Sequence, residues 1–268
     1  MKKVLSIAGS DSGAGAGIQA DLKTFSALGV YGMTAITSVT AQNTTGVSGI
    51  QDISPDLVLK QIDAVFSDIG VDAVKIGMVS NNEIIMAIAE GLKKWKADRV
   101  VLDPVMISES GSYLLQKDAR ETLINELIPL ATIITPNLYE GMALANKEIN
   151  SLEEMEEVAR DLYNLTSSAV LLKGGHLSDK QLSDKAIDIF YDGDSIYSFE
   201  AVKLDNRNTH GTGCTYSSAI AAYLSLGFEI KEAIAKAKNY ISEAIRSGID
   251  IGQGPGPTNH FFDMWKCE

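Results

Sequence analysis

The feature that most constrains the fold is a regular alternation of short, nearly uninterrupted apolar segments with amphipathic segments of helical length. Apolar runs this short and rich in β-branched residues are typical of strands covered on both faces. We expect strands at Val4–Ala8, Ala73–Gly77, Val100–Leu102, Thr132–Thr135 and Val170–Lys173. Alternation with helices predicts right-handed βαβ units and a mainly parallel sheet.

Two helices have clear start signals. Ser54-Pro55 is a cap followed by a first-turn proline, and the apolar positions then recur with helical spacing at Leu59, Ile62, Phe66 and Ile69. Ser151 with Glu154 three residues later predicts a capping box for a helix that runs to about Leu165.

The pattern changes to strict alternation near Ala186–Lys203. Asp192-Gly193 divides this stretch as a turn would, so it predicts a β-hairpin. No linker, repeat or low-complexity stretch interrupts the 268 residues. We therefore expect one domain over residues 1–268, a three-layer α/β/α sandwich whose mainly parallel central sheet carries a β-hairpin at one edge.

Composition narrows the classes of partner. The formal net charge of −12 argues against nucleic acid or an anionic membrane as the main partner, but placed lysines, backbone amides and Mg²⁺ can still hold the phosphates of a small ligand. No apolar run is long enough to span a bilayer, and the N-terminal run is too short for a secretory signal. Cys214 and Cys267 match no metal or disulfide spacing. We expect a cytoplasmic protein without a membrane partner.

The strongest local motif is Asn208–Cys214, which leads into a segment of small residues. Gly211 and Gly213 permit a tight turn, and the amides of Gly211, Thr212, Gly213 and Cys214 would open a helix whose positive end favours an anion. Cys214 falls in the first turn, where the pKa of a thiol is commonly lowered. An ordinary glycine-containing helix start with a small buried cysteine is an equal alternative.

A second glycine-rich loop, Gly9–Gly17, directly follows the first expected strand. It is not a clean dinucleotide fingerprint, and the sequence has no Gly-Lys-Ser/Thr of a P-loop. A pliable backbone at the carboxyl end of a strand is where open α/β sheets bind ligands. A plain glycine-rich turn is the alternative.

Three more strand ends carry polar residues. Asp103 suits Mg²⁺ or a phosphate-bound water, while Asn137 and Glu140 are spaced for one helix face and could serve Mg²⁺ or only as N-cap and first-turn charge. Lys173 could aim its ammonium group at phosphates, or could merely end a strand. Together the five segments supply an anion hole, a base, magnesium ligands and a cation for phosphoryl transfer. We expect His210 and His260 to be structural and Tyr216 to lie in the core.

These segments resemble the hydroxymethylpyrimidine/phosphomethylpyrimidine kinases of the ribokinase-like superfamily almost from end to end. The matching stretches are IAGSDSGAGAGIQADLKTF (Ile7–Phe25), GMTAITSVTAQNT (Gly32–Thr44), KIGM (Lys75–Met78), LDPVM (Leu102–Met106), TPNLYE (Thr135–Glu140), LKGGH (Leu172–His176), NTHGTGCTYSSAIAAYL (Asn208–Leu224) and GPGPTNHF (Gly254–Phe261). The resemblance implies ATP and Mg²⁺ as cofactors, a homodimer, and two phosphorylations that give the pyrimidine pyrophosphate used in thiamine biosynthesis.

The resemblance also assigns residues. It implies a catalytic group of Gly211, Thr212, Gly213 and Lys173, with Cys214 where sugar-kinase relatives carry an aspartate base. The magnesium and phosphate group would be Asp103, Asn137 and Glu140, and the substrate pocket Gly9, Asp21, Gln42, Met78 and Val105. The first phosphate would lie near Lys173 or the Gly9–Gly17 loop during the second step. Ser108–Ser112 is the expected lid, for its Ser and Gly content.

Gln42 has a physical reason to choose the substrate. Its amide offers one donor and one acceptor, complementary to a 4-aminopyrimidine edge. The main rival is a pyridoxal kinase of the same branch, whose members tend to have Met in place of Gln42, Ala in place of Thr212 and a cysteine after the D-P-V-M segment. A non-catalytic ligand-binding module on the same fold is the rival from another class. The retained Cys214 and Lys173 argue against it, because binding alone requires no base.

Overall fold

The computed structural model describes residues 1–106, 114–116, 118–175, 177 and 184–264. One eight-stranded sheet forms the middle layer, in the spatial order β10-β9-β8-β7-β6-β5-β1-β2. Its strands are β1 (Lys3–Ala8), β2 (Tyr31–Ile36), β5 (Ala73–Ile76), β6 (Val100–Leu102), β7 (Ile133–Ile134), β8 (Ala169–Lys173), β9 (Lys185–Tyr191) and β10 (Ile196–Val202). A separate antiparallel pair joins β3 (Ser38–Asn43) to β4 (Gly46–Asp52).

The strands from β2 to β8 run parallel, and only β9 and β10 are antiparallel to their neighbours. The chain therefore confirms both the mainly parallel sheet and the hairpin at one edge. The direction of winding reverses between β1 and β5, because β2 lies on one side of β1 and all later strands lie on the other. Open α/β sheets bind ligands at the carboxyl ends of strands beside such a reversal.

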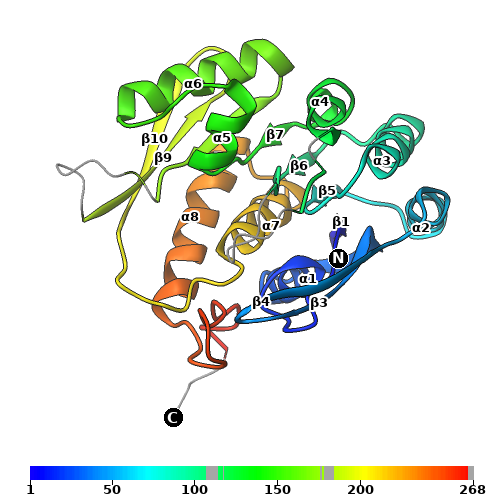
Figure 1. Cartoon of the computed structure of the whole chain (residues 1–268), viewed down its shortest axis with the longest axis horizontal. Coiled ribbons are helices and arrows are strands. Elements are labelled where there is room, and N and C mark those ends of the chain that lie inside the picture. Colours follow the sequence, from blue (N-terminus) through cyan, green and yellow to red (C-terminus); the bar gives the residue numbers. More distant parts are fainter. Residues whose placement is uncertain (107–113, 117, 176, 178–183, 265–268) are drawn as a thin grey trace.

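Helices cover both faces of the sheet (Figure 1). On one face lie α1 (Gly17–Ala27), α7 (Thr212–Ser225) and α8 (Ile230–Arg246). On the other lie α2 (Pro55–Asp68), α3 (Asn82–Trp95), the short α4 (Ala119–Thr122) with its continuation Leu123–Leu130, α5 (Leu138–Ala145) and α6 (Leu152–Thr166). Among the described residues, no helix is long and apolar enough to cross a membrane.

Two apolar cores explain why the strands read as continuous apolar runs. Leu5 and Ile7 of β1 pack into the core beneath α2 and α3, whereas Val4 packs into the core beneath α7 and α8. Successive side chains of a strand point to opposite faces, so a strand with two covered faces needs apolar residues at every position.

Most local expectations are confirmed, with small differences at the ends of elements. Helix α2 begins at Pro55 as predicted. At α6 the hydroxyl of Ser151 accepts the Glu154 amide, but the Glu154 carboxylate accepts the amide of Asn150 in place of that of Ser151. The expected capping box is thus only half formed. The β3–β4 pair was not predicted, because its strands are mostly polar and their few apolar residues, such as Val39 and Ile50, are exposed.

Candidate functional site

A cavity of about 410 Å³ opens at the carboxyl ends of the parallel strands, beside the reversal between β1 and β5. A volume of this size suits a small organic ligand. Its walls bring together nearly all of the residues singled out from the sequence: Gly9, Gln42, Met78, Asp103, Val105, Asn137, Glu140, Lys173, Gly211, Thr212, Gly213 and Cys214. These residues come from the ends of five strands, from β3 and from the starts of α5 and α7.

The beginning of α7 faces this cavity. Gly211 is the N-cap residue with φ of +82°, a conformation that glycine adopts without strain, and it has no side chain to cap the helix. A Cβ atom at Gly211 would lie 1.8 Å from the carbonyl oxygen of Gly15, so only glycine permits this close approach between the two loops. The positive end of the helix is thereby presented to whatever occupies the cavity.

Lys173 stands beside this helix end. Its Nζ lies 2.8 Å from Oδ1 of Asp103 and would lie 3.5 Å from a Cβ atom placed on Gly213. Burial alone would lower the pKa of Lys173, but the charges of Asp103 and Glu140 outweigh it and raise the pKa, so the ammonium group stays charged. Asp103 is held in turn by the Thr135 hydroxyl at 3.0 Å.

Asn137 and Glu140 form a complete capping box at the start of α5. The Asn137 side chain accepts the Glu140 amide at 2.9 Å, and the Glu140 carboxylate accepts the Asn137 amide at 2.8 Å. The capping alternative is therefore real, although both side chains also line the cavity. Burial first, and then the nearby charge of Asp103, raise the pKa of Glu140 to about 7.

The arrangement fits Mg²⁺ that arrives with a phosphate ligand. When ionised, Asp103 and Glu140 place two negative charges beside the single ammonium group of Lys173. Among the described residues, no group of three or more Asp, Glu, His or Cys side chains could hold a metal alone. Mg²⁺ is commonly held by one or two carboxylates together with substrate phosphates and water.

The raised pKa of Glu140 leads to a prediction about stability. Its ordinary value is 4.5 and its folded value about 7, so between these pH values the folded protein keeps a proton that the unfolded chain has lost. Stability therefore falls as the pH rises through this window. We expect Glu140→Gln to unfold like the parent at pH 4.5, and at pH 8 to be more stable by on the order of 2 kcal/mol. Urea unfolding at both pH values measures this; an equal difference at both would contradict it.

The pKa of the Cys214 thiol is raised, although a place in the first turn of a helix commonly lowers it. Burial comes first and raises the pKa of the thiol to about 11, and the charges of Asp21 and Asp103 raise it too. The ammonium of Lys75 and a hydrogen bond from the Gly17 amide act in the opposite direction but do not outweigh them. Helix position alone does not fix a thiol pKa, because the loss of hydration acts on the thiolate directly.

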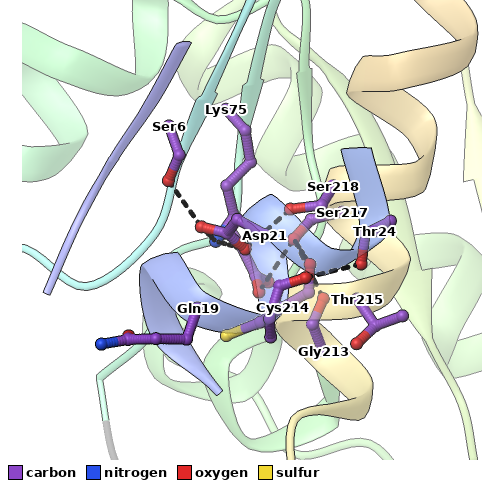
Figure 2. Close-up of polar contacts among 12 residues, drawn as sticks. Ser6, Gln19, Asp21, Thr24, Lys75, Gly213, Cys214, Thr215, Ser217 and Ser218 are labelled. Carbon is purple, nitrogen blue, oxygen red and sulfur yellow. Dashed lines mark hydrogen bonds and ion pairs between the residues drawn. The ribbon is translucent and has the colours of Figure 1, made fainter. Parts of the chain in front are cut away.

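Asp21, expected in the substrate pocket, is not among the residues that line the cavity. Its fully buried carboxylate pairs with Lys75, with both oxygens 2.9 Å from Nζ, and accepts from Ser6 at 2.6 Å and Ser218 at 2.7 Å. Figure 2 shows these three side chains gathered around Asp21, with Cys214 on the neighbouring turn of α7. The pair joins α1, β5 and α7 behind the cavity.

Gln42 is placed by its backbone. The Ser12 hydroxyl accepts the Gln42 amide at 2.8 Å and donates to the Gln42 carbonyl at 2.7 Å. The register of β3 against β4 shifts between Ala41 and Gln42, which marks a bulge at this position. Bulges re-aim side chains, and here the side chain of Gln42 reaches the cavity wall.

Sequence reasoning missed several residues of the cavity. Asp11 and His210 meet there through Nε2 and Oδ2 at 2.9 Å, and the buried pair Lys238–Asp188 lies at 2.6 Å. A lysine on the apolar face of α8 was the available signal for Lys238. Tyr216 is buried as expected but also borders the cavity. The far end of the cavity is lined mainly by apolar side chains: Ala186, Ala201, Val202, Leu204, Ile241 and Ile245.

Three features named in the sequence analysis fall outside the described residues. They are the lid at Ser108–Ser112, His176 after β8, and Cys267 near the C-terminus. Cys214 is a free thiol.

Comparison with known proteins gives a consistent result. A family model described as phosphomethylpyrimidine kinase matches residues 11–259. A hydroxymethylpyrimidine/phosphomethylpyrimidine kinase of Rhizobium meliloti is 52% identical, covering 98% of both chains. The thiamine biosynthesis bifunctional protein ThiED of Geobacter sulfurreducens is 50% identical over 96% of this chain and 52% of its own length.

Solved structures show the same fold. A phosphomethylpyrimidine kinase of Clostridium difficile aligns with a TM-score of 0.81 at 49% identity, over 91% of this chain and all of that one. A Bacillus subtilis pyridoxal kinase in complex with ADP aligns with a TM-score of 0.89 at 40% identity, over 97% of both chains. These likenesses confirm the kinase fold expected from the sequence.

Proposed function

The chain belongs to the phosphomethylpyrimidine kinase family, and we propose that it transfers phosphate from ATP to 4-amino-5-hydroxymethyl-2-methylpyrimidine and then to the resulting monophosphate. The observation that carries this proposal is the meeting of Lys173 with the first turn of α7 across one small space. Phosphoryl transfer needs a fixed cation and fixed amides around the moving group, and both are in place.

The two ends of the cavity suit the two substrates. The apolar end between β10 and α8 offers Val202, Leu204 and Ile241 to the adenine ring of ATP. The phosphates would then run toward Lys173 and α7, where Asp103 and Glu140 would hold Mg²⁺. When bound, the ion would neutralise charge on the phosphates. The pyrimidine would lie at the other end, near Gly9, Gln42 and Met78.

Cys214 lies where the acceptor hydroxyl would reach the helix end. A thiol with a pKa of about 11 is ionised in only about one molecule in 10⁴ at pH 7. A loose transition state leaves the proton on the attacking oxygen until late, so it demands little of a base. We assign Cys214 to orienting the acceptor hydroxyl group, whose proton leaves late in the transfer to an oxygen of the transferred phosphate.

The monophosphate step needs room for a phosphate on the acceptor. Of the two places considered, the Gly9–Gly17 loop is the poorer, because the amides of Gly13, Gly15 and Ala16 already donate to the Asp11 carboxylate. A phosphate there would meet a like charge and occupied donors. We therefore place it on the side of Lys173 and the start of α7.

An ADP-release assay with Mg-ATP tests the proposal. Hydroxymethylpyrimidine, its monophosphate and pyridoxine are compared side by side. We expect turnover of both pyrimidines and weak turnover of pyridoxine. A preference for pyridoxine would assign the chain to vitamin B6 chemistry, and silence on all three would favour a non-catalytic binding module.

The choice between pyrimidine and pyridoxine leads to a prediction at Gln42. Replacing Gln42 by Met removes the donor–acceptor pair offered to the aminopyrimidine edge and leaves that edge unpaired. We expect Gln42→Met to lower kcat/KM for hydroxymethylpyrimidine about 100-fold and to leave pyridoxine within about 3-fold. The control is Gln51→Met, which replaces an exposed glutamine on the partner strand β4. Equal losses on both substrates would contradict a role in specificity.

Three broader features complete the proposal. We propose a single kinase domain, because all strands between Lys3 and Val202 except the β3–β4 pair enter one sheet. We propose a homodimer, for which Val39 on β3 offers exposed apolar surface, and which light scattering of the purified protein would test. We place the enzyme in the cytoplasm, which supplies ATP and keeps a thiol such as Cys214 reduced.

A further inference from the structure

The Gly9–Gly17 loop is built around an internal anion. Asp11 is 1% exposed and accepts three backbone amides, those of Gly13 at 2.8 Å, Gly15 at 3.0 Å and Ala16 at 2.8 Å. Burial opposes ionisation of Asp11, but the bonds from His210 and from the amides outweigh it and lower its pKa. The carboxylate therefore takes the place in this loop that a bound phosphate has in other glycine-rich loops.

Asp11 also reaches across the chain to the loop that precedes α7. Its Oδ2 lies 2.9 Å from Nε2 of His210, a residue 199 positions away. Because the carboxylate is ionised and can only accept, Nε2 of His210 carries the hydrogen. The backbone of His210 is itself fixed, since its amide donates to Gly256 at 3.0 Å and its carbonyl accepts from Thr258 at 3.3 Å.

The contact between the two loops leaves no spare room. A Cβ atom on Gly15 would lie 2.2 Å from Cδ2 of the His210 ring, and one on Gly211 would lie 1.8 Å from the Gly15 carbonyl oxygen. His210 immediately precedes Gly211, the N-cap of α7. The position of the first amides of α7 therefore depends on where the Asp11 carboxylate holds the His210 ring.

We propose that Asp11 and His210 form a positioning pair that fixes the first turn of α7 against the substrate loop, so that its amides meet the transferring phosphoryl group. The pair touches neither reacting atom in this account and acts through Gly211 and Gly213. The proposal rests on the kinase function proposed above. A displacement of about 1 Å at a reacting centre costs about 100-fold in rate, so weakening the contact between Asp11 and His210 is expected to lower the rate strongly.

Four variants test the pair in the full-length protein. Asp11→Asn and His210→Ala weaken or remove the contact, while His210→Gln keeps an N–H donor near the position of Nε2. We expect His210→Ala to lower kcat about 30-fold with the KM for hydroxymethylpyrimidine within about 2-fold, and His210→Gln to recover most of kcat. The kcat of the Asp11→Asn/His210→Ala double variant is expected to be little lower than that of either single variant, because both substitutions disrupt the same contact.

The matched control is Asp192→Asn. Asp192 also caps a turn, accepting the amides of Asp194 and Ser195 at 2.9 and 2.7 Å, but it is exposed in the β9–β10 turn. It should keep parental kcat. The proposed positioning role would be refuted by additive losses of kcat in the double variant. It would also be refuted by a His210→Gln enzyme with a kcat as low as that of His210→Ala.

Hydrogen exchange separates this proposal from the proposed function. We expect His210→Ala to exchange the amides of residues 211–215 at least about 10-fold faster than the parent, while those in the middle of α8 stay unchanged. This result requires no turnover. If the parent protein turned over none of the three substrates, but hydrogen exchange still responded to His210→Ala in this way, the proposed kinase function would be refuted. The proposed positioning pair of Asp11 and His210 would stand. Unchanged exchange of the amides of residues 211–215 in a folded His210→Ala protein would refute the positioning pair.

Discussion

Lys173→Met is expected to lower kcat for hydroxymethylpyrimidine by about 10²–10³-fold, the loss typical when one fixed donor to a developing charge is removed. Within the part of the chain that the structure describes, Lys173 is the cation nearest to the cavity side of Gly213, and its side chain is only 14% exposed. No solvent cation can replace it at a fixed distance. The measurement is ADP release at saturating Mg-ATP, with KM determined for each substrate.

Two controls separate lost chemistry from lost folding. Lys185→Met removes an exposed partner of Glu200 at the same 2.8 Å distance and should leave kcat unchanged. Lys173 lowers the pKa of Glu140, so without Lys173 the Glu140 carboxylate takes up a proton more readily. Near pH 7 this protonation removes one of the two buried negative charges that Lys173 had balanced. Circular dichroism should therefore show a folded Lys173→Met protein. Turnover within about 3-fold of the parent would contradict the role of Lys173.

The sequence predicted the sheet well because each signal was local. Apolar runs such as Val100–Leu102 become buried strands wherever helices cover both faces, and the hairpin needed only alternation and an Asp-Gly turn. The β3–β4 pair escaped prediction because its strands are mostly polar and exposed. The topology explains the site as well. Neighbouring parallel strands have their carboxyl ends at the same edge of the sheet, and this brings Asp103, Asn137 and Lys173 together.

Sequence reasoning did not reach the properties of residues whose contacts lie far away along the chain. The place of Cys214 in α7 is one where a thiol pKa is commonly lowered, but burial and two carboxylates from other elements raise it. The resemblance supplied Asp21, but its pairing with the buried Lys75, 54 positions away, has no local signal in the sequence. The contact between Asp11 and His210 likewise has no local signature, since 199 positions separate them.

Gly213→Ala should separate stability from catalysis more sharply than any other single change. The added Cβ would lie 3.4 Å from Asp103 and 3.5 Å from Lys173, which are ordinary contacts, so the free protein can accommodate it. Gly213 lies within α7, where alanine is favoured over glycine by up to about 1 kcal/mol. We expect an unchanged or slightly higher melting temperature, with a rise of roughly 2 °C at most.

The same methyl group would stand between the helix amides and the Lys173 ammonium, in the space proposed for the transferring phosphate. We expect kcat to fall about 100-fold or more in a protein at least as stable as its parent. Gly211→Ala supplies the contrast, because its Cβ would meet the Gly15 carbonyl at 1.8 Å and its φ is +82°, so stability and activity should fall together. A stable Gly213→Ala enzyme with parental kcat would show that the phosphoryl group passes elsewhere, and Lys173 would then have to be reassigned with it.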